Sequence, residues 1–391
     1  MKFTMRKFMM RAAQPAVLLA LALALAPSTF AQGNVKGSSQ PASLIVFPKF
    51  IQGTVALPEG GTAPITELEI GVVCPHGVTC VAHQPVTIRF HWVCGTTEMA
   101  ESTGSVCQVT DFDVTATVNE KIILTPNGET ANAYGSGLPT KSVPAANCPN
   151  GGGYLIGWVI DTTDQPIKFD GLIGEAHLRP GSPAAAPNPF AGSPTALASY
   201  DATPIQADAN LATGAAITLN SDGGLIFDGG AGHYQAVAGG KVLGDVRYTN
   251  LTTGPTFTTG VLTLLTLDVK ANRPNNPVFV NLDFFGGNPS FIGNENVLST
   301  STAFVCWAEV PITVINSDLT TSMMGREGVV VSGPATKQAF RGISDQTGRV
   351  PVLGLSETLE GGVFPPVAPW PRASFSKLFN NGVPVQAHFV P

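Results

Sequence analysis

Two cysteines and two histidines, the residue types that bind zinc, share one short stretch of the chain. They are Cys74, His76, Cys80 and His83. Structural zinc takes four such ligands in a tetrahedron. The spacings C-x-H and C-x5-C differ from those of common zinc fingers, and paired cysteines form disulfides in oxidising compartments. The sequence therefore favours a disulfide or a plain loop, leaves these residues as weak zinc candidates, and predicts no cofactor.

Three carboxylates gather around a second predicted turn. Asp161, Asp164 and Asp170 could offer oxygen ligands to calcium. They lack the alternating spacing and the closing glutamate of a calcium loop, and aspartate is a common turn former. We therefore expect turn-forming side chains here and no metal.

In residues 86–94 every second residue is apolar and those between are mostly polar, as in a half-buried strand. Arg89 and His91 fall on its polar side and could bind an anionic group. The pattern favours the simpler interpretation that both face solvent.

Four tryptophans could stack on sugars: Trp92, Trp158, Trp307 and Trp370. The first three lie in strand patterns and are expected in the core, so only Trp370 is expected to be exposed. The chain has no G-x-S-x-G elbow, no H-E-x-x-H, no Walker loop, no dinucleotide fingerprint and no C-x-x-C-H. We predict no catalytic residues, although carboxylates distant in sequence could still meet.

The first 31 residues have the features of a signal peptide. A basic start is followed by an apolar run from Pro15 to Ala26 and by the small-x-small pattern Thr29-Phe30-Ala31. Cleavage there removes four positive charges and takes the formal net charge from −6 to −10. A mature chain that is acidic and poor in Lys and Arg is not expected to bind nucleic acid. No second long apolar run follows, so no transmembrane segment is predicted in the mature chain.

Six cysteines in an exported chain predict disulfides in the periplasm, at the cell surface or outside the cell. Cys94 ends the apolar strand and Cys107 begins the next, so these two could clamp the intervening loop. Cys74 and Cys80 could pair across their own loop. Cys148 and Cys306 would then remain to tie the two halves of the chain together. Six cysteines allow 15 pairings, so the connectivity stays open.

The chain reads as short strands separated by turns, with no long helical period. The strand at 86–94 has a counterpart at 278–285, in which Val280 stands for Ile88, Leu282 for Phe90 and Phe284 for Trp92. Residues 154–160 are apolar on both sides and are expected to be buried on both faces. This pattern predicts an all-β protein made of two tandem β-sandwich domains of immunoglobulin-like or jelly-roll type. A single large jelly roll is the alternative.

The predicted organisation has six parts. These are a signal peptide (1–31), a flexible leader (32–42), a first sandwich (43–179), a linker rich in Pro, Ala, Gly and Ser (180–204), a second sandwich (205–362), and a Pro-rich arm with a terminal hairpin (363–391). The hairpin is expected from the turn Asn380-Asn381-Gly382. It could pack on its own domain or add strands to a neighbouring molecule.

Several segments resemble a group of uncharacterised secreted bacterial proteins with all-β folds. They are SLIVFPKF at 43–50, WVCGTT at 92–97, LTPN at 124–127 and GYLIGWVIDTTDQPIKFDGLIG at 153–174. The resemblance implies export and a β architecture, and it assigns no activity or functional residue.

These observations favour a secreted or cell-surface protein with a structural or interaction role. Its expected partners are itself or components of the cell envelope, and self-association through β-strand addition fits the terminal hairpin. The alternative is a carbohydrate-binding module or a glycan-acting extracellular enzyme.

Overall fold

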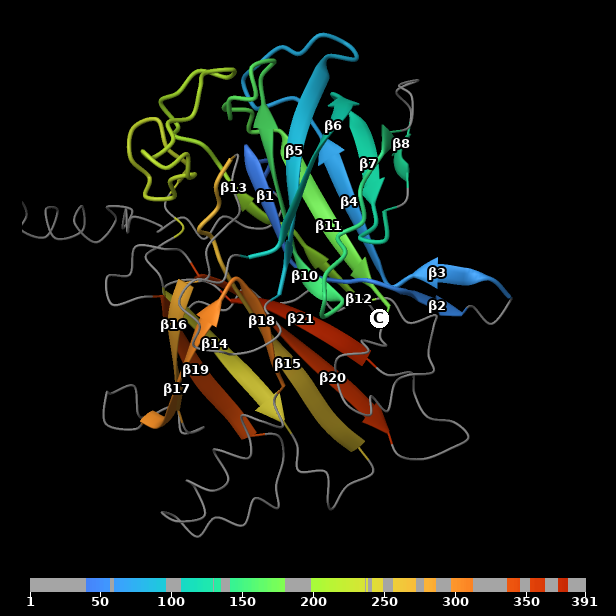
Figure 1. Ribbon diagram of the computed structural model, residues 1–391, viewed down its shortest axis with the longest axis vertical. Coiled ribbons are helices and arrows are strands. Elements are labelled where there is room, and N and C mark those ends of the chain that lie inside the picture. The colour runs from blue at the N-terminus through green and yellow to red at the C-terminus, as the bar shows by residue number, and fades with distance from the viewer. Residues whose placement is uncertain are drawn as a thin grey trace, which may run out of the picture. The chain divides into compact units, whose positions relative to one another are not determined.

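The described part of the protein is all-β. The computed structural model describes residues 40–56, 60–95, 107–128, 130–134, 141–179, 198–235, 237, 241–248, 256–271, 278–285, 297–311, 336–344, 352–362 and 372–378. These residues form antiparallel sheets of the sandwich type and contain no helix (Figure 1). Consequently none of them belongs to a helix long and apolar enough to cross a membrane. The predicted signal peptide lies outside the described residues.

A first set of strands builds two large sheets. One sheet has the order β13-β1-β10-β5-β6 and the other the order β12-β11-β4-β7-β8-β9, while β2 and β3 pair separately. The bounds are β1 (Leu44–Ile51), β2 (Thr54–Ala56), β3 (Thr62–Pro64), β4 (Thr66–Val72), β5 (Pro85–Cys94), β6 (Val109–Thr117), β7 (Glu120–Leu124), β8 (Thr130–Tyr134), β9 (Lys141–Ser142), β10 (Gly152–Ile160), β11 (Leu172–Leu178), β12 (Ala198–Asp201) and β13 (Thr203–Ile205).

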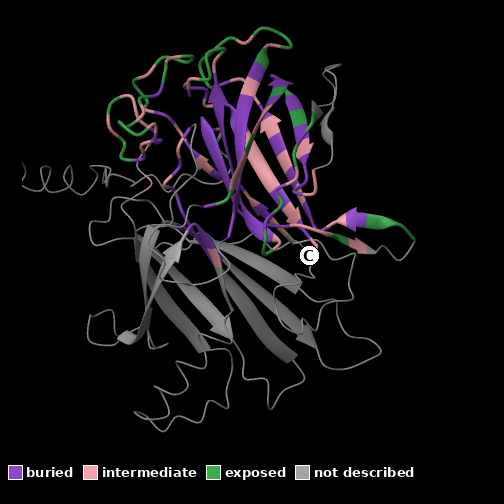
Figure 2. Cartoon of the chain, in the orientation of Figure 1, coloured by how far each residue is buried: buried purple, intermediate pink, exposed green. Residues whose placement is uncertain are grey.

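The apolar pattern of each strand matches its place in these sheets. In β4, Leu68, Ile70 and Val72 alternate with partly exposed residues, so one face packs and the other meets solvent. In β10 all nine residues are buried, which confirms the predicted burial of residues 154–160 on both faces (Figure 2). The five-stranded sheet therefore has a core on each side.

The central strand β5 is buried on both faces as well. Ile88, Phe90 and Trp92 pack in the core that β4, β7 and β11 share. The opposite face carries Val93, and there the sheet packs against a second core. This core adds residues from 205–237 and 265–271, with Trp307 and Leu353. The prediction of a half-buried strand is wrong, because a long segment after the sheet returns to cover its polar-looking face.

Pro48 lies inside the first strand. β1 continues to Ile51, and its register with β10 shifts between Phe47 and Phe50. Proline lacks an N–H and is tolerated inside a sheet at such a bulge. The carbonyl groups there find side-chain donors: Trp307 Nε1 donates to Pro48 O at 2.8 Å, and Tyr200 Oη donates to Lys49 O.

A second set of strands repeats the order of the first. Its bounds are β14 (Lys241–Tyr248), β15 (Thr256–Thr266), β16 (Val278–Phe285), β17 (Val297–Val305), β18 (Trp307–Pro311), β19 (Thr336–Ser344), β20 (Val352–Gly362) and β21 (Arg372–Leu378). Its sheets run β14-β19-β16-β17 and β21-β20-β15-β18. The first set contains the same orders as β1-β10-β5-β6 and β12-β11-β4-β7.

The eight strands of the second set correspond to eight strands of the first set, namely β1, β4, β5, β6, β7, β10, β11 and β12. Each group of eight can be numbered in chain order. In both sets, the strands of one sheet then lie in the order first, sixth, third, fourth, and those of the other sheet in the order eighth, seventh, second, fifth. β5 and β16 are both third strands, as expected from the match between residues 86–94 and 278–285. The domain boundaries remain a prediction. β12 lies within the predicted linker and pairs with β11, and β13 crosses its end at residue 204 and pairs with β1.

The predicted tail contributes one described strand. β21 pairs with β20 of the same chain over seven residues, from Gly354 opposite Leu378 to Glu360 opposite Arg372. The turn Asn380-Asn381-Gly382 and the second strand of the predicted hairpin lie outside the described residues. Most of the predicted leader lies outside them too, but Ala42 is held by Leu172 through a pair of backbone hydrogen bonds.

Three disulfides form: Cys74–Cys80, Cys94–Cys148 and Cys107–Cys306. Of the pairings considered from the sequence, which left the connectivity open, Cys74 with Cys80 forms, whereas Cys94 with Cys107 and Cys148 with Cys306 do not. Val93 lies opposite Val109, so Cys94 and Cys107 fall on opposite faces of their sheet. Cys94 meets Cys148 in one core, and Cys107 meets Cys306 in the other.

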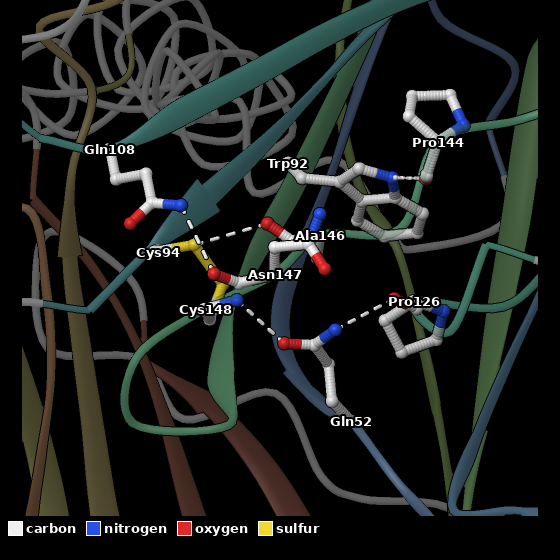
Figure 3. Close-up of a disulfide and its surroundings, with 9 residues drawn as sticks. All are labelled: Gln52, Trp92, Cys94, Gln108, Pro126, Pro144, Ala146, Asn147 and Cys148. Atoms are coloured by element: carbon white, nitrogen blue, oxygen red, sulfur yellow. Dashed lines mark hydrogen bonds between the residues drawn. A yellow bond between two sulfur atoms is a disulfide. The ribbon is translucent and has the colours of Figure 1, made fainter.

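The Cys94–Cys148 bridge is surrounded by side chains that bind backbone groups (Figure 3). Gln52 accepts from Cys148 N at 2.7 Å and donates to Pro126 O at 3.0 Å. Trp92 Nε1 donates to Pro144 O at 3.1 Å. These contacts fasten residues 144–148 to the ends of β1 and β5. Three disulfides of this kind are typical of proteins that work in an oxidising, extracellular environment.

Candidate functional site: the outer strands of the sheets

The loop that holds the weak zinc candidates is closed by a disulfide. Because Cys74 and Cys80 are bonded to each other, neither sulfur can serve as a zinc thiolate. Among the described residues no group of three or more His, Cys, Asp or Glu could hold a metal ion. The loop instead presents Val78 and Val81, which are 39% and 73% exposed.

The three aspartates considered for calcium bind separate partners. Asp161 Oδ1 accepts from Thr163 Oγ1 at 2.7 Å and from two backbone N–H groups, as a turn-forming aspartate does. These hydrogen bonds, the one from Thr163 Oγ1 foremost, lower the pKa of Asp161. Asp164 pairs with Arg89, and Asp170 accepts from Ser43 Oγ at 2.7 Å. No common oxygen cage results.

Arg89 is not solvated, contrary to the prediction. It is 9% exposed and forms a two-pronged ion pair with Asp113, at 2.9 Å from Nε and 3.1 Å from Nη2. Nη2 also lies 3.0 Å from Asp164 Oδ1. The hydrogen bond with Asp113 raises the pKa of Arg89. An arginine whose donors already face two carboxylates has little capacity left for an anionic ligand.

His91 is buried too, so its predicted exposure is wrong. The ring is 2% exposed and lies edge-on to Trp158, with 4.6 Å between ring centroids. Neither ring nitrogen has a hydrogen-bond partner. Burial lowers the pKa of His91 to about 4, because the imidazolium would lose its hydration without gaining a partner.

Three of the four tryptophans lie in the cores as predicted. Trp92, Trp158 and Trp307 are each at most 4% exposed. Trp370 lies outside the described residues. The carbohydrate alternative therefore gains no exposed tryptophan from the described part of the chain.

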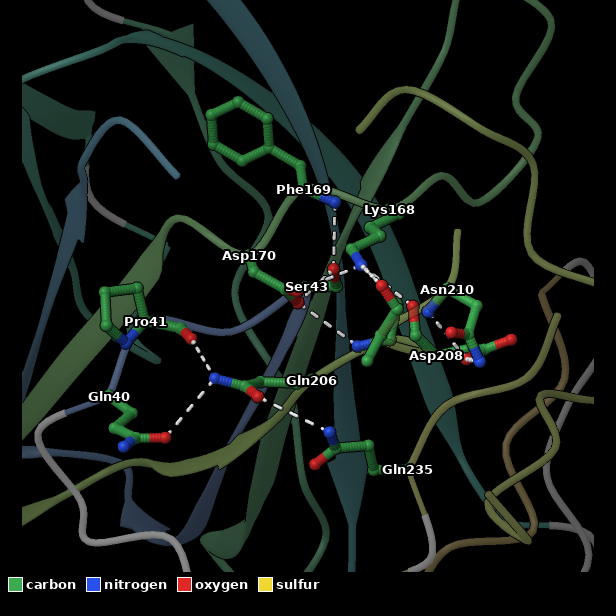
Figure 4. A network of polar contacts seen from close by, with 12 residues as sticks. Gln40, Pro41, Ser43, Lys168, Phe169, Asp170, Gln206, Asp208, Asn210 and Gln235 are labelled. Atoms are coloured by element: carbon green, nitrogen blue, oxygen red, sulfur yellow. Dashed lines mark hydrogen bonds and ion pairs between the residues drawn. The ribbon is translucent and has the colours of Figure 1, made fainter. Parts of the chain in front are cut away.

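A polar network that the sequence analysis missed holds the segment after β13 against the first sheets (Figure 4). Asp170 Oδ1 accepts from Ser43 Oγ and from Ala207 N. Lys168 Nζ donates to Asp208 O at 2.8 Å and to Ala209 O at 3.2 Å, and lies 3.8 Å from Asp170 Oδ2. The polar groups named here are hydrogen-bonded to one another. The network therefore fastens residues 207–209 to Ser43, Lys168 and Asp170 and offers no open ligand site among these groups.

A further candidate site for interaction is formed by the outer strands, each of which pairs with a strand of its sheet on one side only among the described residues. Proteins protect such edges with charged side chains or proline. Seven of the eight outer strands of the four large sheets carry such a residue. They are β6 (Asp111, Asp113), β9 (Lys141), β12 (Asp201), β13 (Pro204), β14 (Lys241, Asp245, Arg247), β18 (Glu309, Pro311) and β21 (Arg372, Lys377).

β17 is the exception among these outer strands. Its sequence VLSTSTAFV has neither a charge nor a proline over nine residues. It pairs with β16 on one side and ends the order β14-β19-β16-β17 on the other. Within the described part of the chain, no strand occupies its second side.

β17 and β6 correspond through the strands beside them. His91 and Arg89 of β5 lie opposite Asp111 and Asp113. In β16, the residues matched to them by aligning Val280 with Ile88 are Asp283 and Asn281, which lie opposite Thr300 and Thr302. Two threonines of β17 therefore stand where β6 has two carboxylates.

Comparison of the chain with protein-family models, with curated protein sequences and with solved structures found no match.

Proposed function

We propose that the mature protein is exported and works as a structural or interaction protein that self-associates by β-strand addition. The signal-like start, with its basic residues and apolar run, supports export. The three disulfides support an oxidising destination such as the periplasm or the cell surface. The resemblance to secreted bacterial all-β proteins agrees with this destination.

The observation that carries the proposal is the composition of β17. A strand added to an exposed edge gains main-chain hydrogen bonds along its length, and charges or prolines on the edge oppose that addition. Seven outer strands have such protection and β17 has none. Its Thr, Val and Phe residues favour extended pairing.

An immunoglobulin-like arrangement of each strand set belongs to the same proposal. In immunoglobulin sandwiches the second strand lies beside the fifth and the third beside the sixth. Both sets have these pairs, as β4–β7 and β5–β10, and as β15–β18 and β16–β19. The first, fourth and seventh strands differ, because each lies in the opposite sheet from its counterpart in the seven-stranded constant type.

The test introduces into β17 the two charges that β6 carries. The variant Thr300→Asp with Thr302→Asp in residues 32–391 puts carboxylates where β6 has Asp111 and Asp113. The control is Thr300→Ser with Thr302→Ser, which keeps the edge neutral. Light scattering should show assemblies for the wild type and the serine variant and a monomer for the aspartate variant. A wild-type protein that stays monomeric at every concentration would refute the proposal.

A further inference from the structure

We infer that the strand that β17 accepts is β17 of a second copy, paired antiparallel across a two-fold axis at Ser301. This inference rests on the proposed function and specifies its partner and register. A two-fold axis at Ser301 would place each residue opposite its mirror position in the strand. The regular part of β17 runs from Ser299 to Val305, because its register with β16 shifts at Leu298, and an axis at Ser301 would pair residues 299–303 of the two copies directly.

The sequence of β17 is complementary to itself in this register. Thr300 would lie opposite Thr302, and beyond the register shift at Leu298 the residues Leu298 and Val297 would lie near Phe304 and Val305 of the partner strand. Aromatic–aliphatic, Thr–Thr and β-branched pairs are among the cross-strand neighbours that stabilise antiparallel sheets. An axis at Thr300 would instead oppose Leu298 with Thr302 and would leave Phe304 and Val305 beyond the partner strand.

The equivalent axis in β6 would be repulsive. Ser301 lies opposite Leu282, and the residue of β6 opposite the matched Phe90 is Phe112. A two-fold axis at Phe112 would place Asp111 of each copy against Asp113 of the other. Like charges directly opposite one another destabilise a strand pair. Of the two corresponding edges, only β17 is compatible with self-pairing.

This pairing would produce a closed dimer. A two-fold interface uses the same surface on both copies, so in the dimer both β17 edges are paired and neither is free to bind a third copy. The two four-stranded sheets would join into one eight-stranded sheet, a size within the usual range. Its new ends would be the two β14 strands, which carry Lys241, Asp245 and Arg247. Charged ends of this kind oppose further growth.

A pair of cysteine variants of residues 32–391 tests the register. Ser301→Cys would bring the two new sulfurs together across the axis, because directly opposed Cα atoms lie about 5 Å apart. Thr300→Cys would place the two cysteines two residues out of register, about 8 Å apart at Cα and beyond disulfide reach. We expect a doubled mass on non-reducing gels for Ser301→Cys alone. Peptide mass should identify a disulfide that joins the substituted positions of the two copies.

The outcomes separate this inference from the proposed function. If wild-type assemblies form and Thr300→Asp with Thr302→Asp abolishes them, but Ser301→Cys gives no covalent dimer, the two-fold register is wrong and strand addition stands. Equal cross-linking of both cysteine variants would also overturn the register. Light scattering of the wild type supplies an independent check, since a mass that rises past the dimer contradicts closure. A monomeric wild type would refute both proposals.

Discussion

β6 and β17 hold the same place in their sheets, each as the fourth strand beside a matched third strand, β5 or β16. β6 has Asp111 and Asp113, of which Asp113 also neutralises the buried Arg89. β17 has Thr300 and Thr302 at those positions, opposite Asp283 and Asn281. In the first set one carboxylate thus does two things: it satisfies a buried cation and it charges an edge.

The difference shows that strand order and edge chemistry vary independently. Both sets share an order, so the order alone does not decide whether an edge accepts another strand. In β6 the charge on the edge is coupled to burial, because Arg89 lies under a covering segment and needs an acidic partner. β17 has no lysine or arginine opposite it in β16, and hence no comparable demand for a carboxylate.

The largest effect should come from cutting the covalent link between the two strands. Cys107 lies two residues before β6 and Cys306 directly follows β17, with a sequence separation of 199. In the chain-entropy view, opening a loop of that length lowers the free energy of unfolding by about 5 kcal/mol. We expect this loss for Cys107→Ser with Cys306→Ser, measured by denaturant unfolding without reductant.

The matched control removes the short bridge. Cys74→Ser with Cys80→Ser opens a separation of 6 residues and should cost about 2 kcal/mol. Equal losses in the two double variants would mean that the long bridge does not hold the β6 and β17 regions together.

His91 should make the first set acid-sensitive. The folded pKa is about 4, whereas the ordinary value is about 6.5. As pH falls through this window the unfolded chain binds a proton that the folded chain does not, so stability falls by about 3 kcal/mol and then levels off below pH 4. His91→Phe keeps a ring beside Trp158 and should remove this component. Parallel curves of unfolding free energy against pH for the two proteins would contradict the prediction.

Asp113→Asn should destabilise the first set by about 2 kcal/mol. Removing one partner of a fully buried ion pair costs ~3–5 kcal/mol. The loss should be smaller here, because Asp113 is partly exposed and Asp164 still faces Arg89. Denaturant unfolding followed by tryptophan fluorescence measures the change.

An exposed ion pair provides the control for Asp113→Asn. Glu69→Gln breaks the pair with Lys121 at the surface and should cost at most about 1 kcal/mol. If the two substitutions cost the same, burial of Arg89 does not explain the carboxylate at position 113.

The sequence predicted the main features of the fold because they depend on local patterns. Alternation identified β5, a continuous apolar run identified β10, and a residue-by-residue match related β5 to β16. Each signal lies within one strand or compares two strands directly. The Cys74–Cys80 bridge was likewise predictable because it closes a short loop.

Features that depend on register or on distant segments were not predictable. A shift of one residue decides the face on which a cysteine lies, and that shift separated Cys94 from Cys107. Arg89 and His91 appeared solvated because nothing local shows that residues 205–237 return to cover them. The unprotected edge of β17 could be recognised only after the sheet order had identified which strands are outermost.

The smallest effect should come from making β6 resemble β17 by one residue. Asp111 is exposed, so Asp111→Thr should change the free energy of unfolding by less than about 0.5 kcal/mol. We would introduce it into the Thr300→Asp with Thr302→Asp variant, in which pairing through β17 is blocked. The mass by light scattering should remain that of a monomer, because Asp113 still charges the edge. If assemblies form, Asp111 alone protects β6, and the role of Asp113 is confined to neutralising Arg89.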